Sequence, residues 1–319
     1  MIHDLGLACT ELLPTLEHLS VDHDAIGILV RRLQRRPLPV PTWDHPAMPQ
    51  QPGPTLDAVV WLGNALNFCY WVPPGQDMWA VDVQGRAEVD ALGLFGALTG
   101  AARDGIDLAD GRWLAREDRG GPALLFERGV GTLPLRQRRV AILNELGHVL
   151  LDHFDGRLEH AVDAAGNDAV GMARFLAASF PSYRDERVYR GRRLAFLKRA
   201  QLAAGMLHLR RRALGVPGLR GTHRLTAFAD YMLPRALRGH GVLRYGPALA
   251  EGVDAQQTLE PHSPEEIEIR VATVGACELI LAALRKHDDT ADALGLDHWL
   301  WAAGQAMGQP HHRVITTDY

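Results

Sequence analysis

The sequence predicts a mainly α-helical protein, organised as one multi-helix domain over residues 1–319 whose helices can group into two lobes, with a few short strands. The main reason is that apolar residues recur every three to four positions along most of the chain, the spacing of a helix with one buried face. Only residues 78–83 and 123–127 read as short strands. With 319 residues, 47% of them apolar, the chain can bury a sizeable core.

Ten segments carry the helical spacing. They are residues 5–18, 22–35, 55–67, 90–103, 134–154, 168–180, 191–214, 225–238, 264–286 and 289–306. The segment from 264 has the clearest start, because Ser263 can cap the helix, Pro264 suits its first turn and Glu266 completes a capping box. Gly156 and Gly215 stand where the helices before them should end.

Two further segments have a distinct composition. The proline-rich stretch 37–54 is expected to be a loop. Trp43 and the lack of a Gly/Ser tract favour a loop docked on the protein over a free linker. The most apolar run, 271–284, has 14 residues and contains Glu278, so we interpret it as a buried helix and not as a membrane span.

Composition limits the classes of partner. The net charge of −4 and the isoelectric point near 6.4 argue against a protein that coats nucleic acid. The three cysteines form no CxxC pair, which argues against a zinc ribbon or a cysteine-held iron–sulfur cluster. Their odd number, and an acid near the start where a secretion signal is basic, favour a cytoplasmic protein. We expect a monomer without a stable nucleic-acid or membrane partner.

Metal-binding patterns are weak. Glu145 and His148 form an E-x-x-H pair, but a di-iron bundle needs a second such pair, and none stands on an apolar helical face. His311 and His312 lack a partner at the spacing of a metal site. We therefore assign no metal and no cofactor.

Lysine is rare in this chain. Only Lys198 and Lys286 are lysines among the 34 basic residues, and the rest are arginines. A lysine kept at one position suggests a need for a compact, titratable ammonium where a planar guanidinium would not serve. The alternative is chance survival.

The segment before Lys198 is rich in cations and hydroxyls. Tyr183, Arg184 and Lys198 border apolar stretches, and two or three such groups could converge on a phosphate. A helix starting near Gly191 would add backbone N–H groups to that site. The alternative, a solvated helix face, is stronger for the other arginines nearby.

Three more groups are candidates for a site. Asp230 lies inside an apolar helical pattern, where a carboxylate needs a salt bridge or a functional role. Glu268 and Arg270 are flanked by apolar residues, and form either an ion pair between helices or a ligand contact. The helix 55–67 ends in Asn67 and a group of three aromatic residues, Phe68, Tyr70 and Trp71. Together they can hold a planar ligand, or they can cap the core.

Five separated motifs resemble the queuosine-salvage proteins, which are queuosine 5′-monophosphate N-glycosylases that release the base queuine. The motifs are SFPSYRDERVYRGRRLAFLKRAQL, LNFCYW, FADYMLPRALRGHGVLRY, EIEIRVATVGACELI and PHHRV, in family order over nearly the whole chain. The resemblance implies an all-helical fold distantly like helix-hairpin-helix DNA glycosylases. It also implies a cytoplasmic enzyme without a cofactor, acting on a small nucleotide.

The resemblance also assigns residues. It implies that Asp230 is the essential carboxylate and Lys198 its basic companion. It also places Asn67, Phe68, Tyr70 and Trp71 in the base pocket, and Tyr183, Arg184 and Asp185 near the nucleotide. Phe228, Tyr231, Glu268 and Arg270 are further candidates for contact with the substrate. Asp230 would stabilise an oxocarbenium-like transition state, as nucleophile or as base toward water. Lys198 would keep Asp230 ionised or bind the 5′-phosphate.

Two other functions are compatible with these patterns. A DNA base-excision glycosylase would need a broad basic surface, which the acidic net charge disfavours. A non-enzymatic protein that binds queuosine nucleotide or tRNA would bind the same ligand without turnover.

Overall fold

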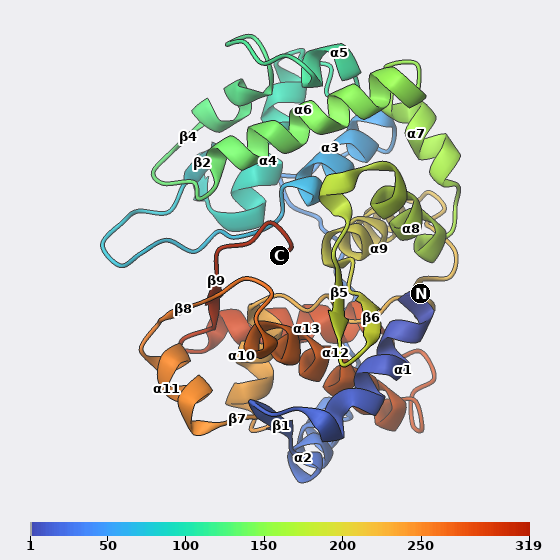
Figure 1. Ribbon diagram of the computed structural model, residues 1–319. Coiled ribbons are helices and arrows are strands. Elements are labelled where there is room, and N and C mark those ends of the chain that lie inside the picture. The colour runs from blue at the N-terminus through green and yellow to red at the C-terminus, as the bar shows by residue number, and fades with distance from the viewer. Residues whose placement is uncertain (1) are drawn as a thin grey trace.

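The computed structural model describes residues 2–319, with side chains from residue 4 onward, and shows a mainly helical protein in two lobes (Figure 1). The upper lobe in Figure 1 is built around one large hydrophobic cluster. Its helices are α3 (Pro54–Ala65), α4 (Asp90–Arg103), α5 (Gly111–Leu114), α6 (Arg136–His153), α7 (Leu158–Ala165), α8 (Ala169–Ser179) and α9 (Lys198–Ala213).

The lower lobe surrounds a second hydrophobic cluster. Its helices are α1 (Ile2–Leu12), α2 (His23–Leu33), α10 (Met232–Gly239), α11 (Pro247–Asp254), α12 (Pro264–Leu284) and α13 (Ala293–Ala306). A third, smaller cluster joins α1, α12 and one strand of the hairpin that leads into α9. The predicted mainly helical class, with helices in lobes, is confirmed. Its likeness to DNA glycosylases stays a prediction.

The strands are short and form four small sheets. An antiparallel sheet in the upper lobe has the order β3 (Arg86–Glu88), β2 (Ala80–Val83), β4 (Gly129–Val130). The other sheets are two-stranded: β1 (Leu19–Val21) with β7 (Leu243–Tyr245), β5 (Glu186–Tyr189) with β6 (Arg192–Ala195), and β8 (Thr258–Leu259) with β9 (Arg313–Val314). Among the strand pairs in the described part of the chain, only β8–β9 is parallel.

All ten predicted helical segments contain a helix, but two of these helices begin seven residues later than predicted. The first is the helix predicted at 191–214. It begins late because Arg190 and Gly191 both have positive φ (47° and 72°) and make a two-residue hairpin turn between β5 and β6. The helix α9 begins at Lys198, so the expected helix start near Gly191 was wrong. Residues 123–127, expected as a strand, belong instead to a 3₁₀ helix that starts at Pro122.

The second of these helices follows Asp230. The predicted helix 225–238 begins at Met232, because the Asp230 side chain accepts hydrogen bonds from the first backbone N–H groups of α10. Pro234, which has no N–H, is tolerated there because it lies in the first turn. Asp230 therefore stands in the loop before the helix and not within it.

Other expectations are confirmed. Residues 34–53 contain no helix or strand, and Trp43 in this loop packs edge-on against Phe95, at 6.5 Å between ring centroids. The apolar run 271–284 lies in the buried helix α12. None of the described helices combines the length and the apolarity needed to cross a bilayer.

Candidate active site

A cavity of about 420 Å³ lies where the two lobes meet, next to a smaller one of about 40 Å³. Five of the seven residues that line both are Asn67, Asp90, Lys198, Asp230 and Trp301. The upper lobe supplies the first three, and the lower lobe supplies the last two. The larger cavity is walled mainly by apolar and aromatic side chains: Pro41, Trp43, Leu202, Met206, Leu209, Phe228 and Leu294.

Lys198 is the first residue of α9, and its side chain is only 4% exposed. Its ammonium donates one long hydrogen bond, 3.5 Å, to the carbonyl of Asn67 and forms no ion pair with a described carboxylate. Burial lowers the pKa of Lys198, while the negative charges of Asp230 and Asp297 raise it. The ammonium therefore keeps donors for a ligand in the cavity.

Asp230 is half-buried and faces both cavities. Its Oδ1 accepts hydrogen bonds from the N–H groups of Met232 (2.7 Å) and Leu233 (3.2 Å), which fix the carboxylate at the start of α10. Its Oδ2 has no hydrogen-bond partner among the described residues. Burial raises the pKa of Asp230, and the charge of Lys198 together with the two N–H donors opposes this rise.

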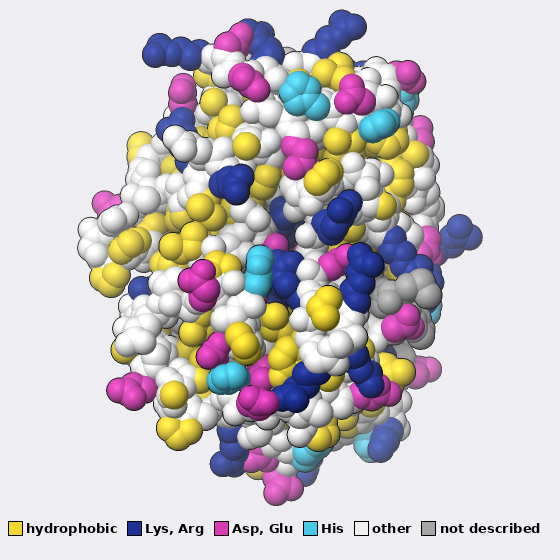
Figure 2. All heavy atoms as spheres, in the orientation of Figure 1, with side chains coloured by type: hydrophobic (Ala, Val, Ile, Leu, Met, Phe, Trp, Pro, Cys, Tyr) yellow, Lys and Arg dark blue, Asp and Glu magenta, His cyan; other side chains and the backbone are white. Residues whose placement is uncertain are grey.

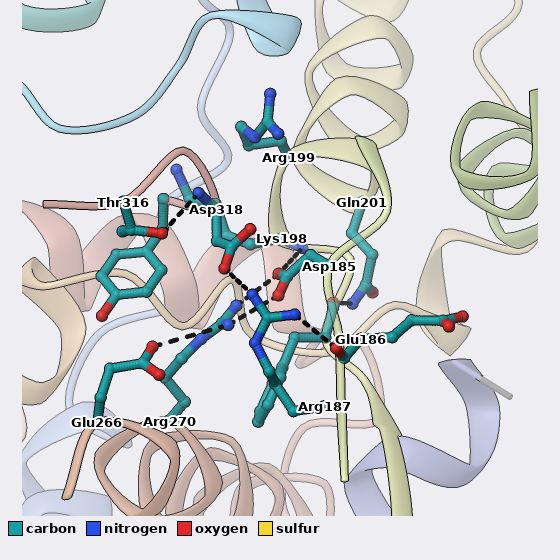
Figure 3. A network of polar contacts seen from close by, with 12 residues as sticks. Asp185, Glu186, Arg187, Lys198, Arg199, Gln201, Glu266, Arg270, Thr316 and Asp318 are labelled. Carbon is teal, nitrogen blue, oxygen red and sulfur yellow. Dashed lines mark hydrogen bonds and ion pairs between the residues drawn. The ribbon is translucent and has the colours of Figure 1, made fainter. Parts of the chain in front are cut away.

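Asp185 and Arg270 lie behind Lys198 and outside the lining of both cavities. The Asp185 carboxylate accepts two hydrogen bonds from the Arg270 guanidinium, at 2.8 and 2.6 Å (Figure 3). It also accepts a hydrogen bond of 3.2 Å from the backbone N–H of Lys198. This buried ion pair thus ties α12 to the first residue of α9 and positions Lys198.

Of the remaining candidates, Tyr183 and Glu268 contact other protein groups. The Tyr183 hydroxyl donates to the carbonyl of Trp61, whereas Arg184 is exposed. Glu268 accepts hydrogen bonds from the N–H groups of Glu17 (2.9 Å) and His18 (2.8 Å). None of these three candidates lines either cavity.

The aromatic group divides between the site and its support. Phe68 and Tyr70 line the smaller cavity, and two buried guanidiniums, of Arg139 and Arg199, lie over the Phe68 ring at 4.2 and 5.3 Å. Both arginines also donate to main-chain carbonyls between residues 65 and 69. Trp71 lies instead against the Arg313 guanidinium, 5.2 Å from its ring centroid.

The last two aromatic candidates flank Asp230. Phe228 lines the larger cavity and Tyr231 the smaller one. The Tyr231 ring stacks on His311 at 4.6 Å between centroids. Burial lowers the pKa of His311 to about 4, so this ring is neutral at pH 7.

Three carboxyl groups in the cavity, those of Glu88, Asp90 and Asp297, were missed by the sequence reasoning. Asp297 on α13 accepts a hydrogen bond of 2.8 Å from the N–H of Phe228, two residues before Asp230. Burial and the negative charge of Asp230 raise its pKa well above the ordinary value. The signal was the one that marked Asp230, an acid among apolar residues. Asp90, at the start of α4, carries no such pattern.

The arrangement suits a ligand with a planar ring next to a group that develops positive charge. The Asp230 carboxyl group and the buried Lys198 amine face one apolar cavity, and such surroundings strengthen every electrostatic contact inside it. Asn67 adds a side-chain amide whose NH₂ donates to Asn64 Oδ1 at 3.3 Å. A flat heterocycle could therefore pack between aromatic walls, with its sugar beside Asp230.

Comparison with known proteins agrees with the motifs. Residues 48–319 match a family model described as queuosine salvage protein. The chain is 34% identical to the queuosine 5′-phosphate N-glycosylase/hydrolase of Sphaerobacter thermophilus over 302 residues, 94% of this chain and 92% of that protein. The Mus musculus protein of the same name is 29% identical over 82% of this chain and 81% of its own. The chain belongs to the queuosine salvage protein family.

Proposed function

We propose that this chain hydrolyses the N-glycosidic bond of queuosine 5′-monophosphate and releases queuine. The names of relatives that match nearly the full length support the reaction and the substrate. The observation that carries the proposal is the placement of Asp230 and Lys198 in one cavity between the lobes, against aromatic walls.

Asp230 stabilises the sugar as its bond to the base breaks. The electron pair of the bond from C1′ leaves with the base nitrogen, and the ribose becomes an oxocarbenium-like cation. A carboxylate whose Oδ1 is already held by two backbone N–H groups needs no reorganisation to face that cation. Oδ2 is free for the substrate.

The leaving base makes this stabilisation more important. Queuine is a 7-deazapurine, so its five-membered ring has a carbon where guanine has a second basic nitrogen. Protonation at that position cannot assist departure, and the sugar cation carries more of the developing charge. Water then adds to C1′, either directly, with Asp230 taking its proton, or after Asp230 has formed an ester with the sugar. In both routes the proton that the water loses balances the one that the departing base nitrogen takes up.

The larger cavity holds the base. Phe228, Trp43 and Trp301 provide ring surfaces, and one base–aromatic stack contributes on the order of 1–3 kcal/mol. Asn67 can face the hydrogen-bonding edge of the heterocycle. Lys198 is the single lysine or arginine among the residues that line either cavity, and it interacts electrostatically with the anionic groups of the site.

The direct test is incubation of the purified chain with queuosine 5′-monophosphate and, separately, with the nucleoside, followed by chromatography. We expect free queuine from the monophosphate. Recovery of intact nucleotide in spite of tight binding would instead identify a binding protein.

A lesion-containing DNA duplex tests the other glycosylase function. Basic side chains are interspersed with acidic ones over the face shown in Figure 2, so we expect no base release at either of two salt concentrations. Base release that weakens at the higher salt would contradict the proposal.

A further inference from the structure

Asp90 is a cavity residue without a role in the reaction proposed above. It is the first residue of α4, on the upper-lobe wall, and it lines both cavities. Its carboxyl group is half-buried, and it forms no hydrogen bond or ion pair with a described side chain. Burial alone raises its pKa, to about 6, so the group is mostly ionised at pH 7. A desolvated charge without a partner is costly unless a ligand supplies the partner.

The protein offers Asp90 no cation. Lys198 is the single lysine or arginine among the residues that line the two cavities, and its charge acts on Asp230 and Asp297. Burial lowers the pKa of His298, the histidine in the larger cavity, and so favours its neutral form. Glu88, on the same wall, already lies 3.4 Å from His45. The residues that line the cavity thus include more carboxyl groups than basic side chains that could neutralise them.

A second observation points to a ligand at the same place. Tyr70 is 6% exposed and lines the smaller cavity together with Asp90. Its hydroxyl forms no hydrogen bond of ordinary length with a described residue, although the Arg139 guanidinium nearby opposes the rise in its pKa that burial causes, so the hydroxyl keeps bonding capacity for a ligand. A buried hydroxyl is normally hydrogen-bonded. A hydroxyl oxygen and a carboxylate that line the same small cavity suit a cationic ligand group with more than one N–H to donate.

We infer that Asp90 binds the protonated amine of the substrate and thereby selects amine-bearing 7-deazaguanine nucleotides over ordinary guanine nucleotides. The inference rests on the proposed function. The substituent at position 7 of queuine is joined through a secondary amine, which is protonated at neutral pH. That ammonium would supply the cation that Asp90 lacks, in a site of low dielectric where such a pair is strong. A guanine nucleotide would leave the carboxylate desolvated and unpaired, which disfavours its binding.

Three nucleotides distinguish recognition of the amine from recognition of the rest of the substituent. They are queuosine 5′-monophosphate, 7-aminomethyl-7-deazaguanosine 5′-monophosphate and 7-deazaguanosine 5′-monophosphate. The second keeps the charge and lacks the ring diol, and the third lacks both. We expect Asp90→Asn to lower kcat/KM about 10- to 100-fold for the two amine-bearing substrates and less than about threefold for the third.

Two further variants complete the design. Asp90→Glu keeps the charge, so it should retain a preference for the amine-bearing substrates. Asp24→Asn replaces an exposed aspartate of α2 outside the cavity and should match the unsubstituted protein on all three. Circular dichroism and thermal unfolding of each variant show whether it is folded.

The outcomes that would overturn the inference are distinct. An equal loss on all three nucleotides would assign Asp90 to the sugar or to the reaction, and a loss confined to queuosine 5′-monophosphate would assign it to the diol. No loss would also contradict it. If the unsubstituted protein releases no base at all, the proposed function fails instead. Calorimetric binding of 7-aminomethyl-7-deazaguanine and of 7-deazaguanine to both proteins then still tests Asp90.

Discussion

Lys198 and Asp230 each support the charge of the other. Burial favours the neutral form of both groups, and the charge of each residue opposes the shift in the pKa of its neighbour. A lysine suits this position, because its compact ammonium stays in the cavity while the backbone N–H is bound to Asp185. A planar guanidinium is larger and would have to displace a neighbour.

Lys198→Arg tests whether the ammonium itself is needed. We expect kcat/KM for queuosine 5′-monophosphate to fall at least about 100-fold, because the guanidinium cannot occupy the same small volume. Lys286→Arg, at the exposed second lysine, is the matched control and should change nothing. Normal turnover by Lys198→Arg would show that the rarity of lysine carries no information here.

Residues that line the cavity could be predicted from the sequence where the local pattern around them was unusual. Asp230 was found because it is an acid among apolar residues, and Lys198 because lysine is rare. Asp297 shares the first signal and could have been found by it. Asp90 could not, because it stands at the start of its helix and its place in the cavity depends on segments distant in the sequence.

At the scale of elements, the hairpin β5–β6 and the helix α12 act together to place the start of α9. The buried pair of Asp185 and Arg270 connects them, and the Arg270 guanidinium also lies over the rings of Phe196 (4.1 Å) and Tyr319 (4.8 Å). The charges are thus fully enclosed by protein groups. Neither residue lines a cavity, so we expect the pair to position Lys198 and not to contact the substrate.

Asp185→Asn should therefore destabilise the fold. Loss of this carboxylate leaves the Arg270 guanidinium buried without its main counter-charge, which costs about 3–5 kcal/mol of unfolding free energy. Asp254→Asn, which removes the partner of Arg238 in a pair whose aspartate is 54% exposed, should cost less than about 1 kcal/mol. Urea unfolding of both variants makes the comparison, and equal midpoints would contradict it.

Helices were easier to predict than their boundaries. The spacing of apolar residues located ten helices, but it could not distinguish the hairpin from helix at residues 191–197. There the Arg190–Gly191 turn determines the structure, because both residues have positive φ. The short strands were mostly missed, because two to four residues are too few to establish an alternation.

For the whole molecule, the site exists only because the two lobes meet. The loop with Trp43 and the helices α4 and α9 supply one side of the cavity, and the Asp230 loop and α13 supply the other. Gly205 of α9 permits this approach, since a Cβ there would lie 2.6 Å from Leu294 and 3.3 Å from Phe228. The sequence predicted that helices could form lobes, but the position of the cavity depends on contacts between distant segments.

The rate of queuine release by Asp230→Asn tests the central claim most directly. The variant keeps one oxygen for the N–H groups of Met232 and Leu233, so it should fold and bind queuosine 5′-monophosphate. It lacks the negative charge that stabilises the sugar cation, so single-turnover release should fall by several orders of magnitude relative to the unsubstituted protein. Release near the unsubstituted rate would contradict the assignment of Asp230 and the mechanism built on it.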